Sequence, residues 1–163
     1  MKRKKSQVGQ IFIYLISTLV VILVLYYGYA AIKGIGKKQE QLSLVKFQKA
    51  IEDTVVYTSS DYGTVRIETF TVPVQFSDVC FVDKNVIVTG NASQINEQQY
   101  PLIYNSVKDR VNKNVFPIPG GDPFYVDKVW VDEGGGFTCF NVAQGNIKVR
   151  IEGFGDRAKV SHP

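Results

Sequence analysis

Residues Val8–Ile32 read VGQIFIYLISTLVVILVLYYGYAAI and carry no charged side chain. From Ile11 onward, about 22 residues form an apolar core that is roughly 33 Å long as a helix, enough to cross the hydrocarbon layer of a bilayer. The polar residues in its middle are Ser17 and Thr18, whose hydroxyls can bond to carbonyls of their own helix. The stretch therefore predicts a transmembrane helix at residues 10–33.

Basic residues flank this helix on both sides and predict its orientation. Four of them crowd the leader at residues 1–9, whereas three lysines are spread over residues 33–38 and are followed by Glu40. The positive-inside rule then places the leader in the cytoplasm and the rest of the chain outside the cell membrane. A secretory signal peptide normally has a shorter apolar region of about 7–15 residues, so we expect a retained single-pass anchor.

The charge balance argues against a nucleic-acid partner. The formal net charge is +4, but the seven basic residues that flank the predicted span exceed this value. The chain from Gln39 onward therefore has a net charge of −3, which leaves no basic footprint for binding phosphates. The partner that the sequence predicts is the lipid bilayer.

A second helical pattern follows the span. Leu44, Phe47, Ile51 and Val55 recur at spacings of three and four, with polar residues among the positions between them. This pattern predicts an amphipathic juxtamembrane helix at residues 34–57. Two glycines near its start either form a joint at the membrane surface or lie within one long helix. The apolar stripe packs either on the domain that follows or on the same helix in neighbouring copies of the chain.

Residues 58–163 have the composition of an extracytoplasmic β-rich domain. The clearest strand pattern is at 146–152, where three apolar residues alternate with charged ones. At 64–72 the alternation changes phase, which indicates a bulge or a crossing between layers. Further strands are expected at 78–82, 85–89, 115–118, 124–132 and 137–142, with an edge strand at 158–161.

One short helix is expected at residues 100–113, where apolar residues return at helical spacing. The predicted strands lie close in sequence and have short links, which favours antiparallel pairing. The fold class that follows is α+β. A long N-terminal helix, transmembrane with an amphipathic extension, carries a small antiparallel β-sheet domain with one short helix.

The two cysteines, Cys80 and Cys139, both lie in predicted strands. Outside the cytoplasm such a pair most often forms a disulfide. Two buried thiols are the alternative, and a redox site is disfavoured because the sequence has no C-x-x-C motif. We expect a disulfide.

Other motifs do not assemble into a catalytic site. The one histidine, His162, is next to the C-terminus, where a solvated tail is expected and no base is available for a serine or cysteine nucleophile. The aspartates lack calcium-loop spacing, and the glycine runs at 120–121 and 134–136 lack the context of a phosphate-binding loop. We expect no enzyme, no cofactor and no metal. Asn91 begins an Asn-Ala-Ser sequon and is a candidate glycosylation site.

The basic leader, the dipeptide Gly9-Gln10 and the apolar helix with its amphipathic extension resemble the N-terminal segment of type IV pilin-like proteins, including archaeal pilins and archaellins. The resemblance implies processing after Gly9, with Gln10 as the mature N-terminus, and assembly of copies into a filament through this helix. Two positions differ from the family pattern. Val8 stands where archaeal precursors usually have a basic residue, and Tyr14 stands where bacterial pilins have an acidic one.

The segments DYGTVRIETF, VCFVD, SVKDRVNKNVF and IKVRIEGFGDRAKVS resemble small single-span membrane proteins of uncultivated archaea. This resemblance implies an archaeal surface protein and assigns no activity. The sequence thus predicts an N-terminally anchored surface protein, structural or adhesive, that is either a pilin-like filament subunit or an anchored extracytoplasmic binding module or envelope assembly factor.

Overall fold

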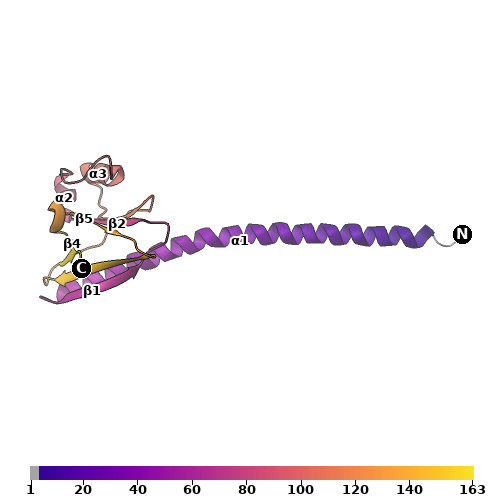
Figure 1. Ribbon diagram of the computed structural model, residues 1–163, viewed down its shortest axis with the longest axis horizontal. Coiled ribbons are helices and arrows are strands. Elements are labelled where there is room, and N and C mark those ends of the chain that lie inside the picture. The colour runs from indigo at the N-terminus through magenta and orange to yellow at the C-terminus, as the bar shows by residue number, and fades with distance from the viewer. Residues whose placement is uncertain (1–3) are drawn as a thin grey trace. The chain divides into compact units, whose positions relative to one another are not determined.

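The computed structural model describes the backbone of residues 4–163 and the side chains of residues 10–30 and 42–163. The chain divides into two compact units that meet between Leu42 and Ser43, and each is described by itself (Figure 1). A long N-terminal helix, short helices and mainly antiparallel sheets confirm the predicted α+β class.

Helix α1 runs from Lys4 to Ser60. Its segment Gln10–Ala30 is long and apolar enough to cross a membrane, and none of it is buried. The two hydroxyls in the segment bond to the Tyr14 carbonyl, at 2.9 Å from Ser17 Oγ and 2.8 Å from Thr18 Oγ1. Both hydroxyls are therefore already hydrogen-bonded within the helix, as an apolar environment requires.

From Ser43 onward, α1 belongs to the second unit. Phe47, Ile51 and Val55 are at most 1% exposed in the core of that unit, and Leu44 packs at its margin. The apolar stripe thus packs on its own domain, the first of the two alternatives left open above. The second compact unit begins at Ser43, because the last turns of α1 supply part of its core.

Gly63 and Gly153 join the end of α1 to the sheet. Gly63 has a φ of 79°, a conformation that favours glycine, and its N–H donates to the Gly153 carbonyl at 2.8 Å. A Cβ on Gly153 would collide with the carbonyl groups of Thr58 and Asp61. The missing side chain therefore lets the sheet approach the helix end directly.

The sheet next to α1 has the strand order β1-β6-β7-β4, with antiparallel pairs except for the parallel pair β4–β7. The expected edge strand at 158–161 is therefore an internal strand. The strands are β1 (Val65–Thr71), β4 (Val129–Trp130), β6 (Asn146–Gly153) and β7 (Ala158–Ser161).

The bulge expected at 64–72 is absent, because β1 pairs with β6 without interruption from Val65↔Glu152 to Thr71↔Asn146. Arg66 and Glu68 share the inner face with Phe70, while Val65 and Ile67 point outward. The Arg66 guanidinium lies 4.8 Å from the centre of the Tyr57 ring on α1. The charged Arg66 side chain can occupy the inner face because the Tyr57 ring makes a cation–π contact with it.

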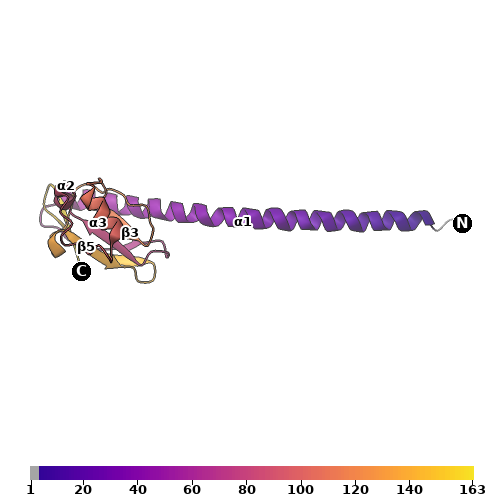
Figure 2. The same ribbon diagram turned by 90° about the horizontal axis from the view of Figure 1, so that it is seen from above.

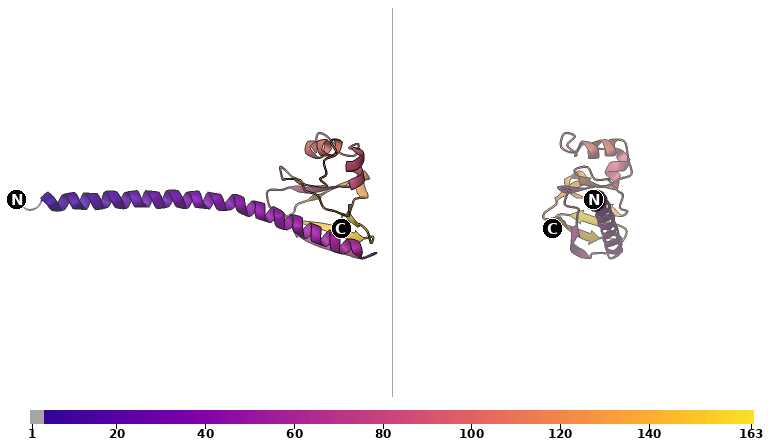
Figure 3. Two further views of the ribbon diagram at one scale, coloured as in Figure 1. Left: turned by 180° about the vertical axis from the view of Figure 1, so that it is seen from behind. Right: turned by 90° about the vertical axis from the view of Figure 1, so that its right-hand side faces the viewer.

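A second sheet has the order β3-β2-β5 and is antiparallel throughout. Helices α2 and α3 lie on the side of this sheet away from the C-terminal part of α1, as the left view of Figure 3 shows. Figure 2 looks onto the domain from the side of these two short helices. One core lies between the two sheets and α1, and the other lies between the second sheet and the two short helices. The elements are β2 (Asp78–Val82), β3 (Val115–Ile118), β5 (Phe137–Asn141), α2 (Lys84–Thr89), α3 (Pro101–Lys108) and the 3-10 helix η1 (Glu133–Gly135).

Residues 85–89, expected as a strand, form most of α2. The Asp83 side chain accepts a hydrogen bond from the Asn85 N–H at 2.8 Å, and Gly90 ends the helix with a φ of 69°. The caps at the two ends of this six-residue helix override the β-branched composition between them. The expected strand at 124–132 is also reduced, to β4 and a single bridge between Phe124 and Val115.

We predict that Phe47→Ala destabilises the domain by about 3–5 kcal/mol, because it leaves a cavity between α1 and both sheets. Val45→Ala is the matched control, since Val45 is on the same helix with its side chain 59% exposed. Denaturant unfolding of the full chain in detergent, followed by the fluorescence of Trp130, measures both variants. Equal midpoints for Phe47→Ala and Val45→Ala would contradict this role of α1.

Candidate functional site

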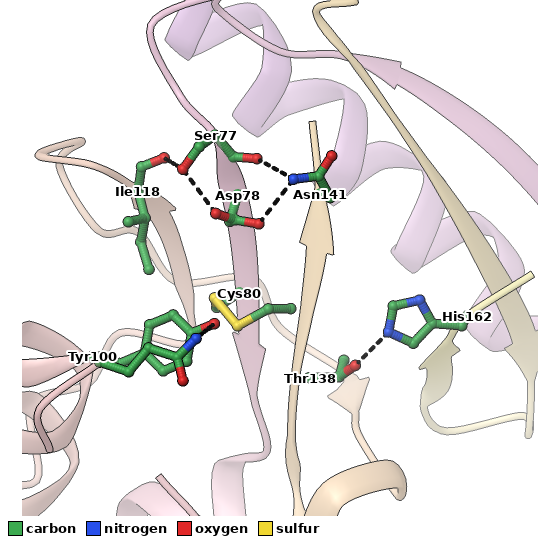
Figure 4. Close-up of a disulfide and its surroundings, with 10 residues drawn as sticks. Ser77, Asp78, Cys80, Tyr100, Ile118, Thr138, Asn141 and His162 are labelled. Carbon is green, nitrogen blue, oxygen red and sulfur yellow. Dashed lines mark hydrogen bonds between the residues drawn. A yellow bond between two sulfur atoms is a disulfide. The ribbon is translucent and has the colours of Figure 1, made fainter. Parts of the chain in front are cut away.

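The predicted disulfide is present. Cys80 on β2 and Cys139 on β5 face each other in the antiparallel register and are bonded, with their Cα atoms 3.9 Å apart (Figure 4). The bond links positions 59 residues apart and stabilises by at most about 4 kcal/mol in the chain-entropy model. Cys80 is fully buried in the core beneath α2 and α3, so the bond fastens the middle of the second sheet.

A polar cluster lies near the disulfide at the start of β2 (Figure 4). Ser77 Oγ donates to Asp78 Oδ2 at 2.7 Å, and Asn141 Nδ2 donates to Asp78 Oδ1 at 3.4 Å. The Ser77 N–H donates to the Ile118 carbonyl at 2.6 Å. These bonds tie β3, β2 and β5 together where the three strands enter the loops.

Tyr100, the residue before α3, packs over the same region, with its ring 5.4 Å from that of Phe137. Burial, and secondarily the negative charge of Asp78, raise the pKa of the Tyr100 phenol above its usual value of 10.0. Both causes favour the neutral phenol in the folded protein. The group acts here as a packed ring with a polar edge, not as an acid or base near neutral pH.

His162 is not a free tail. Its Nε2 lies 3.1 Å from Thr138 Oγ1 (Figure 4). The centre of its ring lies 4.5 Å from that of the Phe140 ring. The backbone N–H of His162 also reaches Glu133 Oε2 at 3.4 Å. The C-terminus is thereby held against β5, because β7 carries it there directly.

The other sequence-predicted positions lie apart from one another. Gly9 is within α1, but its surroundings lie outside the described residues, and Gln10 is exposed. Asn91 is exposed in the loop after α2, where its Oδ1 accepts the N–H of Ser93 at 3.2 Å. The sequon is therefore accessible in the structure.

A polar cleft of about 390 Å³, which the sequence analysis missed, opens where the β2–α2 turn meets the loop before β4 and the β6–β7 hairpin. Four separate segments contribute to it, the fourth being Asn114 just before β3, so no local motif marks it. Its walls carry carboxylates, amides, basic groups and two aromatic rings. The lining residues are Asp83, Lys84, Asn85, Asn114, Tyr125, Asp127, Lys128, Val129, Trp130, Asp156 and Arg157.

Two of these lining residues hold the cleft together. The buried Asn114 amide exchanges two bonds with the backbone of Val126, each 2.7 Å long. Besides capping α2, the Asp83 carboxylate accepts the Val131 N–H at 3.2 Å. Both side chains are occupied by backbone groups, so they position the loop that carries the cleft.

The remaining groups are available to a ligand. Arg157 lies 4.3 Å from the centre of the Trp130 ring, and Tyr125 Oη donates to Asp127 Oδ1 at 3.2 Å. The lining includes carboxylates, ammonium groups and a guanidinium, and the described lining residues include neither histidine nor cysteine. This arrangement suits binding of a small polar group by hydrogen bonds and ring contacts better than acid–base or nucleophilic chemistry.

Within the described residues, no group of three or more histidine, cysteine, aspartate or glutamate side chains is placed to hold a metal ion. Comparison of the chain with protein-family models, with curated proteins and with solved structures finds no match.

We predict that Tyr100 ionises above pH 10, so that this residue's contribution to stability falls as the pH rises through its raised pKa, since the unfolded chain then loses the proton first. The difference between the alkaline absorbance titrations of the wild type and Tyr100→Phe isolates this phenol. Asp78→Asn should lower the pKa part of the way, because the smaller cause is removed. A Tyr100 phenol that titrates at or below 10 would refute the assignment.

Proposed function

We propose that the chain is an N-terminally anchored surface protein with its leader in the cytoplasm and the domain from Ser43 onward outside the membrane. The apolar, unburied segment Gln10–Ala30 supports the anchor. The Cys80–Cys139 bond supports an oxidising compartment for the domain. The basic excess of the leader supports the orientation.

The role that we propose for this protein is structural or adhesive, as a type IV pilin-like filament subunit. The observation that carries the proposal is the division of α1, whose N-terminal segment is apolar and unburied while its C-terminal turns form the core of a β-rich domain. Leader removal between Gly9 and Gln10 would free the apolar segment to exchange lipid for the same segment of neighbouring copies. Close packing must drive this exchange, because leaving lipid brings no hydrophobic gain.

A second candidate is an anchored binding module or envelope assembly factor that does not polymerise. The polar cleft favours it, since a filament subunit has no need of a cleft lined by Tyr125, Trp130 and charged side chains. In this role the anchor keeps the cleft at the cell surface. Both roles require binding and neither requires catalysis.

We predict that protease added to intact cells degrades the domain and leaves the anchor in the membrane, because the basic asymmetry places residues 43–163 outside. Immunoblotting with an antibody against the domain, together with mass measurement of the anchor fragment that stays in the membrane, separates the two parts. The same treatment after lysis provides the control for protease resistance of the fold. A domain that is protected until lysis would reverse the proposed orientation.

The two roles differ in the effect of Gly9→Leu. For a filament subunit we predict that this change leaves the leader uncleaved, keeps the protein in the membrane and abolishes filaments. Intact mass measurement and electron microscopy record both effects. Gly28→Leu is the control, since a Cβ at Gly28 meets nothing within 4 Å and leader removal should be unaffected. Native protein that retains its leader, together with unchanged behaviour of Gly9→Leu, would favour the anchored module.

A further inference from the structure

Strand β1 is an edge of its sheet and lies at the rim of the domain (Figure 1). It pairs with β6 along its whole length without a bulge, so the edge is regular. Its outer face exposes apolar side chains, with Val65 46% and Ile67 62% exposed. Such an edge is a template for pairing with another strand unless something prevents it.

The backbone groups that face the free edge can be identified from the pairing with β6. The Gly153 N–H donates to the Thr64 carbonyl at 2.9 Å, and the Val72 N–H donates to the Gly145 carbonyl at 2.8 Å. Since hydrogen-bonded positions alternate in an antiparallel pair, the even-numbered residues of β1 bond to β6. The N–H and C=O groups of Val65, Ile67 and Thr69 therefore point to the free edge.

The inner face of β1 carries a charge pattern that is complementary to itself. Arg66 and Glu68 are half-buried, and neither forms an ion pair among the side chains that the structure describes. The Arg66 Nε is buried without a hydrogen-bond partner. A buried guanidinium nitrogen of this kind is costly unless a carboxylate or another acceptor reaches it.

We propose that β1 is a docking edge for a second copy of this chain, which pairs antiparallel about a twofold axis at Ile67. In this register Ile67 faces Ile67 of the second copy and Val65 faces Thr69, and all of these residues have edge-facing backbone groups. Arg66 then lies opposite Glu68 twice, at the closer, non-hydrogen-bonded positions. The two four-stranded sheets join into one continuous sheet of eight strands.

The charges of Arg66 and Glu68 disfavour other ways of pairing β1 with its second copy. Parallel pairing in register sets Arg66 beside Arg66 and Glu68 beside Glu68, which is repulsive. Moving the twofold axis by one residue, to Arg66 or Glu68, keeps the edge-facing groups in step but sets Arg66 opposite Arg66, or Glu68 opposite Glu68, of the second copy, which is repulsive. The edge is thus specific for its own copy in one register. This pairing does not depend on whether the leader is removed.

The register is tested by cross-linking Ile67→Cys in the full chain, in detergent micelles, with a short bifunctional maleimide. The native cysteines are bonded to each other and do not react. Because Ile67 lies on the twofold axis, we expect a cross-linked dimer. Lys148→Cys is the control, since Lys148 is exposed on the neighbouring strand opposite Thr69 and should give no dimer. The Lys148→Cys variant carries the same anchor as Ile67→Cys. If contacts between anchors alone brought two copies together, the two variants would therefore be cross-linked equally.

Charge exchange in the Ile67→Cys background then tests the complementarity. Arg66→Glu and Glu68→Arg should each lose the cross-linked dimer, because like charges face each other across the axis. Mixing these two variants should restore it as a mixed dimer, since each supplies the charge that the other requires. Equal cross-linking of Ile67→Cys and Lys148→Cys, or a mixture that stays as monomeric as its components, would overturn the proposal.

Discussion

The domain depends on the packing of the last turns of α1 against two sheets at once. Phe47 and Val55 are both buried in this core. The Phe47 ring meets the Phe124 ring edge-on, with 6.0 Å between the ring centres. Sheet β1-β6-β7-β4 closes one side, and β2 with β5 closes another. Without the helix, neither sheet has a complete apolar partner for its inner face, and a small domain cannot leave such a face in water.

This dependence explains which features the sequence could predict. The helical stripe and the alternation at 146–152 are long periodic signals, and a helix and a strand buried on one face must show them. The cysteine pair follows from compartment chemistry, and the register of β2 and β5 places the two residues opposite each other. For these elements, the structure that the local sequence pattern favours is also the one that the tertiary contacts stabilise.

The features that could not be predicted depend on contacts between distant segments. The phase of β1 is set by Tyr57, which receives Arg66 on the inner face, so local alternation alone points the wrong way. Helix α2 forms because Asp83 caps it while also bonding to Val131, 48 residues away. The cleft depends on the buried Asn114 and on a hairpin far along the chain. No periodicity or motif in the sequence marks these partners.

The strand order has a consequence for how the protein is made. β1 pairs with β6, in which Asn146 is 75 residues after its partner Thr71, and the core that α1 begins also includes Val160 on β7. During synthesis α1 emerges first, but its C-terminal turns have no complete sheet to pack on until β6 and β7 have been made. Closure of these long loops is therefore the main kinetic barrier to folding of the domain. The helix that organises the core is thus made long before the strands that complete it.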